Sequence, residues 1–361
     1  MNVFMNATPL ALLCCCLLTA CATVPRMERV RIATDQRGFV LMPSGKTFHP
    51  WGHNYCGNGG RLIEDHWETE WPTVVEDFRE MKALGANVVR VHLQFGKFMD
   101  APDKPNEAAL HRLGRLVTLA EQTGLYLDIT GLACYRPKDV PAWYDKLNEA
   151  ERWAAQARFW EAVAERCATS PAIFCYDLIN EPISPVAKRQ KGGWYSGNLF
   201  GGYDFVQFIA LDPGKRTKEE VALHWINTLT TAIRKHDRQH FITVGLWLWS
   251  GFTPAKVAPS LDFLCVHIYP VSGKHEAAMA ELRQYAAGKP VVIEETFPLS
   301  CSAPELEKFL LASREYACGW IGHYDGKTIA DYEAKKRTIA EAIWLSWLEL
   351  FQKLTPIMRG Q

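Results

Sequence analysis

The sequence Asp-Leu-Ile-Asn-Glu-Pro at residues 177–182 decides how the fold is interpreted. It follows the apolar run 173–176, which has the character of a buried parallel strand, and Pro182 ends that strand because proline cannot donate a ladder hydrogen bond. Asn180 and Glu181 therefore place an amide and a carboxylate side by side where a strand gives way to a loop. A polar strand exit without special function would have the same short pattern, so the stretch needs a second signal.

That signal is another β-rich run with an acidic end, Lys-Pro-Val-Val-Ile-Glu-Glu at residues 289–295. In a β/α barrel the carboxyl ends of all strands converge on one face, which is the catalytic face of such barrels. Two strands with acidic ends therefore predict a site built from two carboxylates.

The alternation of side chains along the second strand distinguishes its two acids. Ile293 and Glu295 share one face of the strand, whereas Val292 and Glu294 share the other. If the first of these faces lines the barrel interior, Glu295 points into the pocket and Glu294 leans toward the helices. We therefore expect Glu295 to be the second carboxylate of the site.

Apolar, strand-like segments alternate with amphipathic, helix-like segments along the chain. The expected strands are residues 50–55, 87–93, 125–129, 173–181, 240–246, 264–269, 289–295 and 319–324. The expected helices are residues 73–84, 106–123, 149–168, 217–236, 274–287, 304–314 and a long closing helix at 329–351. This order predicts a single α/β domain, a (β/α)8 TIM barrel. An alternating stretch at 30–49, around a Pro-Ser-Gly-Lys turn, predicts a short N-terminal β-hairpin on the barrel floor.

Composition limits the kinds of partner. The chain has 361 residues, of which 48% are hydrophobic, and its 40 basic and 40 acidic residues leave no net charge. A neutral chain without a basic run lacks the electrostatic basis for nucleic-acid binding. The 13 Trp, 12 Tyr and 17 Phe residues will mostly fill the core, but aromatic rings also stack on the apolar faces of sugars. We expect a neutral small molecule or polymer as the partner.

The first residues do not belong to this fold. Residues 1–20 carry no charge, and their apolar run 10–18 has the length of a signal-peptide core and is too short to span a bilayer. Leu-Thr-Ala-Cys at 18–21 resembles a bacterial lipobox, so we expect a signal peptide at 1–20, lipidation of Cys21, a tether at 21–29 and the barrel at 30–361. No Lys or Arg precedes the apolar run, which leaves an ordinary cleaved signal or a misassigned start as alternatives.

A lipidated Cys21 would hold the protein at a bacterial membrane, in the periplasm or on the cell surface, where disulfides form. Seven cysteines follow the leader, so at least one is unpaired: Cys56, Cys134, Cys167, Cys175, Cys265, Cys301 and Cys318. Cys175, Cys265 and Cys318 fall within expected strands and are most simply core residues. The sequence leaves open a disulfide among Cys56, Cys134 and Cys301. No zinc-like cysteine spacing is present, and we expect no metal or cofactor.

Four strand-end motifs resemble glycoside hydrolase family 5, the cellulase-like family of the large clan of (β/α)8 retaining glycosidases. They are Val-Arg-Val at 89–91, Ile-Asn-Glu-Pro at 179–182, Val-His-Ile-Tyr at 266–269 and Val-Ile-Glu-Glu at 292–295, on the second, fourth, sixth and seventh strands. The resemblance covers most of the chain after residue 30. It implies that Glu181 is the acid/base and Glu295 the nucleophile, with the two carboxyl groups ~5–5.5 Å apart.

The same resemblance assigns supporting roles. It places Arg90 near the nucleophile, which would keep that carboxyl ionised. It assigns Asn180 to the sugar 2-hydroxyl, Tyr269 to a place beside the nucleophile and His267 to the same cleft. A buried structural ion pair is the plain alternative for Arg90, and a hydrogen-bonded core histidine is the alternative for His267.

Two departures from the family pattern affect substrate binding. The third strand does not end in the histidine that the family often has, and either His92 or His53 would have to occupy that space. The eighth strand offers Trp320, His323 and Tyr324 where the family usually has a tryptophan under the sugar, and the sequence does not choose between them.

Loops are expected to set specificity. The segment 184–212 carries Trp194 among glycines and is interpreted as a lid or subsite wall, with packing on the barrel rim as the alternative. Trp249, after the fifth strand, is a candidate for sugar stacking or for the core. A β-linked glucan, mannan or related oligosaccharide would suit such a cleft, and endo and exo action both remain open.

The sequence supports other functional classes less well. The sequence has no Gly-x-Ser-x-Gly, His-Glu-x-x-His or phosphate-loop motif. A catalytically silent carbohydrate-binding lipoprotein on the same barrel is one alternative, but a binder has no need of two opposed carboxylates. A transglycosylase that transfers the sugar to an acceptor other than water is another. The sequence thus favours a glycosidase.

Overall fold

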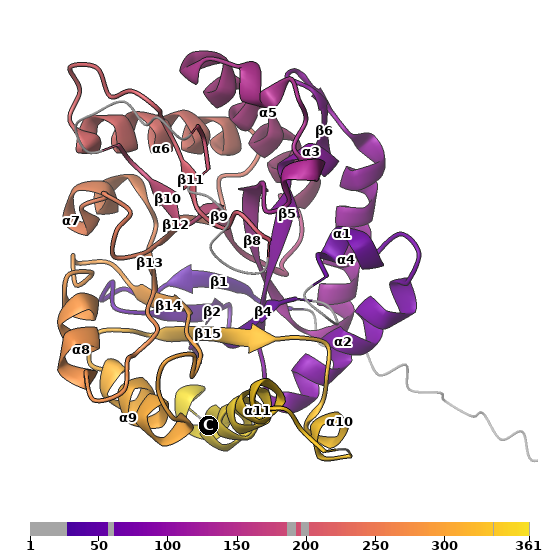
Figure 1. Ribbon diagram of the computed structural model, residues 1–361, viewed down its shortest axis with the longest axis vertical. Helices are drawn as coiled ribbons and strands as arrows, with labels where there is room; N and C mark the ends of the chain where they lie inside the picture. Colours follow the sequence, from indigo (N-terminus) through magenta and orange to yellow (C-terminus); the bar gives the residue numbers. More distant parts are fainter. Residues whose placement is uncertain (1–26, 57–60, 186–192, 196–201, 335, 361) are drawn as a thin grey trace, which may run out of the picture.

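The computed structural model describes residues 27–56, 61–185, 193–195, 202–334 and 336–360 (Figure 1). The expected signal peptide, Cys21 and most of the tether lie outside these residues and stay predictions. Within the described part, no helix has the length and apolar character needed to cross a membrane.

Eight parallel strands close into a barrel in the order β12-β13-β14-β15-β4-β5-β8-β9. Their bounds are β4 Trp51–Tyr55, β5 Val88–Gln94, β8 Tyr126–Ala133, β9 Ile173–Asn180, β12 Phe241–Leu246, β13 Leu264–His267, β14 Val291–Glu295 and β15 Gly319–Tyr324. The prediction of a (β/α)8 barrel is confirmed, and its strands follow the expected segments closely.

Helices surround this barrel (Figure 1). The longer ones are α2 Trp71–Leu84, α4 Glu107–Thr123, α5 Glu149–Cys167, α6 Lys218–Arg234, α8 His275–Arg283, α9 Ala303–Ser313 and α11 Ile339–Met358. Short ones are α1 Ile63–His66, α3 Phe95–Phe98, α7 Pro254–Val257 and α10 Ile329–Glu333. Gly85 ends α2 in a left-handed conformation (φ +107°), which glycine adopts without a steric penalty.

The expected closing helix at 329–351 is wrong as a single element, because α10 and α11 are separate. Thr338 caps the first turn of α11: its side chain accepts a hydrogen bond from the backbone of Glu341, and the Glu341 carboxylate accepts one from the backbone of Thr338. Such a reciprocal cap marks a helix start, and the apolar periodicity alone did not reveal it.

The barrel floor is covered by a small antiparallel sheet, β1 Arg29–Ile32, β2 Phe39–Met42 and β3 Thr47–Phe48. The expected hairpin is thus present and gains a third short strand. Phe39 is buried among the rings of Phe174, Phe241 and Phe263, with ring centroids 5.2, 5.6 and 5.4 Å away. Because this sheet closes the bottom, the interior opens at the carboxyl ends of the strands.

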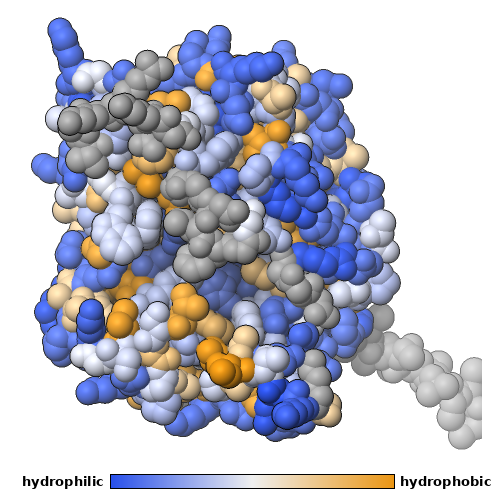
Figure 2. Space-filling view, viewed as in Figure 1, coloured by the Kyte–Doolittle hydropathy of each residue, from blue (hydrophilic) through white to orange (hydrophobic). Residues whose placement is uncertain are grey.

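The cysteines after the leader are all free in the described residues, so no disulfide joins Cys56, Cys134 and Cys301. Cys175, Cys265 and Cys318 are buried core residues, as expected. On the face seen in Figure 2, hydrophobic side chains occur in small separate groups among hydrophilic ones. The two clusters of buried apolar side chains lie inside the barrel and beneath its helices.

The floor sheet should be needed for stability. Phe39→Ala should lower the free energy of unfolding by about 3–5 kcal/mol, because it removes a buried ring and leaves a cavity. Met42→Ala is the control, since Met42 is 48% exposed on the same strand and should change stability by less than about 0.5 kcal/mol. Urea denaturation checks both variants, and equal small effects would show that the sheet is dispensable.

Candidate active site

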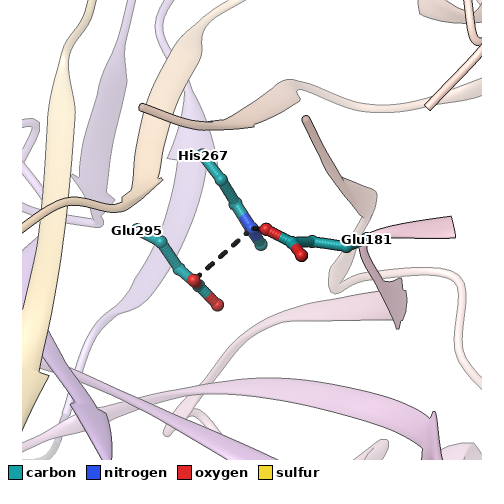
Figure 3. A group of neighbouring side chains, drawn as sticks. All are labelled: Glu181, His267 and Glu295. Carbon is teal, nitrogen blue, oxygen red and sulfur yellow. Dashed lines mark hydrogen bonds and ion pairs between the residues drawn. The ribbon is translucent and has the colours of Figure 1, made fainter. Parts of the chain in front are cut away.

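Glu181 and Glu295 face each other at the open end of the barrel (Figure 3). Glu181 follows β9 directly and Glu295 ends β14. One carboxylate oxygen of each, together with a ring nitrogen of His267, lies within 4.8 Å of the others. The two side chains are 16% and 11% exposed, so both are largely enclosed and still open to a ligand.

The backbone of Glu181 is held in an unusual conformation. Its φ is +44°, in the left-handed region that residues with a side chain enter at a cost of about 1–3 kcal/mol. Its N–H donates to the carbonyl of Gly245 at 2.9 Å, and the pairing of β9 with β12 shifts by one residue just before it. This bulge in β9 directs Asn180 and Glu181 into the site.

The strand-face argument for Glu295 is wrong, although Glu295 does lie in the site. Val292 packs inside the barrel and Ile293 packs outside it, so simple alternation would place Glu294 in the interior and Glu295 outside. The pairing of β14 with β13 shifts between Ile293 and Glu295, which are opposite consecutive residues of β13. The bulge brings both acids to the site, with Glu294 fully buried below Glu295.

Arg90, which is fully buried on β5, holds the acids together. Its guanidinium donates to Glu295 at 2.6 Å and to Asp177 at 2.7 Å, and it lies 3.4 Å from Glu294. It also donates to the side-chain oxygen of Asn180 at 3.0 Å. The expected contact with Glu295 is present, and Arg90 is at the same time the centre of a buried ion network.

His267, on β13, lies between the two candidate catalytic acids (Figure 3). Its Nδ1 is 3.0 Å from Glu181 and its Nε2 is 3.2 Å from Glu294. Burial alone would lower the pKa of His267, but the charge of Glu295 and the hydrogen bonds with Glu181 and Glu294 raise it to about 10. The ring is therefore an imidazolium at neutral pH and donates to an acid from each nitrogen.

Glu295 is kept ionised by its neighbours. Burial alone would raise the pKa of Glu295, but the positive charges of His267 and Arg90 hold it far below its usual value. The hydroxyl of Tyr269 also donates to Glu295 at 2.6 Å, and the same hydroxyl is 2.9 Å from Nε2 of His323. These contacts produce an anionic carboxylate, which is the state that a nucleophile requires.

Glu181, His267 and Glu295 also have the donor types of a metal site. As an imidazolium, His267 has no lone pair to give to a metal, and Arg90 beside Glu295 would repel a cation. The arrangement fits proton transfer and nucleophilic attack better than metal binding.

Two predicted sugar platforms do not line the site. Trp320 is buried, and its indole N–H donates to Ser313 of α9 at 2.8 Å. Tyr324 is buried against α2, where its hydroxyl donates to Glu80. Both side chains point from β15 toward the helices, and His323 is the residue of this strand that reaches the site.

The third strand lacks the histidine that the family often has, and His92 of the neighbouring strand β5 lies near the site instead. His92 contacts the hydroxyl of Tyr135 at 2.6 Å and the side-chain oxygen of Asn54 at 3.1 Å, the same oxygen that accepts a hydrogen bond from Arg90. Burial and the charge of Arg90 hold the pKa of His92 well below its usual value. His53 instead packs on Phe351 beneath the helices. Of the two alternatives, the structure therefore brings His92 to the site.

The two predicted loop tryptophans differ in their exposure. Trp194 is buried, with the guanidinium of Arg152 lying 4.3 Å from its ring centroid, so it anchors the loop on α5. Trp249 is 70% exposed and contacts Trp247 edge to face after β12. Trp249 thus remains available to a ligand. Within the expected lid, residues 186–192 and 196–201 lie outside the described residues.

Several site residues were missed or misplaced from the sequence. They are Asp177, Glu294, Asn54, Asp128 and Tyr135, which contact or surround Arg90 and the acids. All of them except Asp128, which is the third residue of β8, lie at or just beyond the carboxyl half of a barrel strand. A polar residue within an apolar strand was the signal, and Asp177 stands in the stretch that opened the interpretation.

A closed (β/α)8 barrel with two opposed carboxylates at the carboxyl ends of its strands has the architecture of the barrel glycosidases. The chain belongs to glycosyl hydrolase family 5: the family model described as cellulase matches residues 46–347. The family resemblance of the strand-end motifs is thereby confirmed.

Individual relatives are distant. A glucan 1,3-beta-glucosidase of Blumeria graminis is 25% identical over 293 residues, 70% of this chain and 58% of the relative. Among solved structures, an exo-beta-1,4-mannosidase from Opitutaceae bacterium strain TAV5 is 19% identical with a TM-score of 0.64, covering 91% of this chain and 62% of that one. A beta-1,4-mannanase from the sea hare Aplysia kurodai is 14% identical with a TM-score of 0.61, covering 91% and 97%. The chain thus spans less than two thirds of the length of the glucosidase and of the mannosidase.

The charge on His267 should appear in the pH dependence of stability. Because its pKa is raised from 6.5 to about 10, the stability it contributes is complete below about pH 6.5 and is lost as the pH rises through about 10. Between about pH 7 and pH 9 the wild type should lose about 1 kcal/mol per pH unit more than His267→Gln. Urea denaturation at several pH values measures this slope.

His236→Gln is the matched control, because His236 is exposed at the end of α6 and should keep the wild-type slope. Equal slopes for the wild type and His267→Gln would mean that His267 is neutral.

Proposed function

We propose that this protein is a retaining glycoside hydrolase that cleaves β-linked bonds of a glucan, mannan or related oligosaccharide by double displacement. The observation that carries the proposal is the approach of Glu181 and Glu295 to within 4.8 Å at the open end of the barrel. Retaining enzymes place their two carboxyl groups ~5–5.5 Å apart, whereas inverting enzymes leave ~6.5–9.5 Å for a water molecule.

In the first step Glu295 attacks the anomeric carbon while Glu181 protonates the leaving oxygen. The two positive neighbours of Glu295 keep it ionised and ready to attack. Oε1 of Glu181 accepts the hydrogen bond from His267, which leaves Oε2 to carry the proton for the leaving group.

In the second step the charge on Glu295 has been consumed by the covalent bond, so Glu181 more easily holds a negative charge. His267 stabilises this carboxylate from 3.0 Å. Glu181 then removes a proton from a water molecule that attacks the anomeric carbon, and Glu295 is released. One acid thus serves as acid and then as base.

Substrate choice rests on similarity. The relatives named above act on β-linked glucan and mannan, and the exposed Trp249, just after the carboxyl end of β12, offers a ring to a sugar face. Asn180 lies 3.0 Å from Arg90 with its oxygen already accepting a hydrogen bond, so its amide is fixed for the expected contact with the 2-hydroxyl. A screen of β-glucans, mannans, xylans and aryl β-glycosides would identify the sugar.

Removing either carboxylate should separate the two roles. Glu295→Gln should abolish turnover, because an amide cannot form the glycosyl intermediate. Glu181→Ala should lower kcat on natural linkages by about 100-fold to 10,000-fold, yet retain activity on aryl glycosides whose leaving groups need no proton. Steady-state kinetics on both substrate types measures this. Glu281→Gln, on the exterior helix α8, is the control. Normal cleavage by the Glu295→Gln protein would refute the assignment.

The stereochemistry of the product tests the double displacement. A β-glycoside should first release the β-anomer, which proton NMR detects before mutarotation. A 2-fluoro sugar should label Glu295, and a label on Glu294 would exchange the roles of the two neighbours. First release of the α-anomer would exclude retention, and products formed only with excess sugar acceptor would identify a transglycosylase.

A further inference from the structure

The barrel interior beneath the site contains a carboxyl group to which the proposed mechanism gives no role. Asp128 lies on β8, opposite Arg90 of β5 and Cys175 of β9, and it is completely buried. A buried acid without a partner is costly, because its charged form loses hydration. Its surroundings therefore define its chemical state.

No backbone, hydroxyl or nitrogen donor in the described part of the chain reaches either oxygen of Asp128 or Oε1 of Glu294. The thiols of Cys175 and Cys265 are the remaining side chains that contact Asp128 and Glu294, respectively. The carboxyl groups of Asp128 and Glu294 lie close enough for a hydrogen bond between them. Two ionised carboxylates have only acceptors, so this hydrogen bond exists only if one of them carries a proton.

The neighbouring charges decide which acid holds that proton. Oε2 of Glu294 lies 3.2 Å from His267 and 3.4 Å from Arg90, whereas Asp128 forms no ion pair among the described residues. Burial alone would raise the pKa of Glu294, but Arg90 and His267 lower it to about 2. Burial and the charge of Glu294 raise the pKa of Asp128 well above its usual value.

We propose that Asp128 is a neutral carboxylic acid that donates its proton in a hydrogen bond to Glu294 and thereby positions His267 against Glu181. The contacts run in series: Asp128 to Glu294, Glu294 to His267 and His267 to Glu181. Asp128 touches no substrate and is a positioning residue. Its effect on catalysis rests on the proposed function, whereas its protonated state does not.

The other charged and titratable groups around this pair are accounted for. They are Arg90 and His92 on β5, Cys175 and Asp177 on β9, Cys265 on β13 and His267 at the end of β13. Asp177 accepts from Arg90, Thr130 and the backbone of Gly245, and burial and the charge of Glu294 raise its pKa to about 7. Above that pH Asp177 is ionised, so a protonated-acid signal measured there would come from Asp128 and not from Asp177.

Infrared spectroscopy detects the proton directly. At about pH 8.5, far above the usual carboxyl pKa of about 4, the wild type should retain the C=O stretching band of a protonated carboxylic acid. The band should shift when the protein is labelled with 13C at the side-chain carboxyl of aspartate, and it should vanish in Asp128→Asn. Glu281→Gln, which alters a partly buried acid on α8, should keep the band. An absent band, or one that survives in Asp128→Asn, would overturn the proposal.

Kinetics test the positioning role. The amide of Asp128→Asn can still donate to Glu294, so kcat should fall by no more than a few-fold and the pH profile should keep its shape. Asp128→Leu has no donor, so kcat should fall by about tenfold or more with KM little changed, and the alkaline limb of the profile should move. Equal losses in both variants would refute the hydrogen-bond role. If the wild type shows the isotope-shifted band but has no glycosidase activity, the protonated state of Asp128 stands and only the proposed function is rejected.

Discussion

The site depends on one buried guanidinium. Arg90 is fully enclosed, yet it joins acids or amides from three other strands: Asn54 of β4, Asp177 of β9 and Glu295 of β14. A buried charge is tolerated only when partners surround it, and removal of one partner from such a pair typically costs about 3–5 kcal/mol. The same contacts that tie these strands together therefore fix the charge of Glu295. The stability of the open end of the barrel and the ionisation of the proposed nucleophile therefore depend on the same Arg90 contacts.

The barrel could be predicted from the sequence because the residues that begin and end its helices and strands act locally. Gly85 ends a helix and Pro182 ends a strand wherever they occur, so the alternation could be predicted segment by segment. The register of β14 against β13 is different, because an extra residue in one strand depends on how two distant segments pair. Strict alternation therefore misplaced Glu294, and the choice of Glu295 as the proposed nucleophile rests on the family motif.

The predictions of Trp320 and Tyr324 as sugar platforms were wrong for a related reason. Trp320 and Tyr324 resemble His323 in having large rings on one short strand, and nothing in their sequence states which face meets the helices. Ser313 of α9 and Glu80 of α2 supply the polar partners that make the outward positions suitable for the indole and the hydroxyl. Those partners lie on other elements, so only the assembled barrel identifies His323 as the inward residue.

Glu181 and Glu295 are the same residue type, and their different neighbours create different chemistry. Glu295 meets two cations and a hydroxyl, which together favour its anion, whereas Glu181 meets His267 and stands on a strained backbone at the rim. Glu294, ionised beneath His267, joins Glu295 and Glu181 in raising the pKa of His267 and so helps to keep the ring an imidazolium. The proton that we place on Asp128 spares Glu294 from facing a second buried anion. The different roles of Glu181 and Glu295 therefore depend on the Asp128–Glu294 pair, which is buried in the barrel beneath the site.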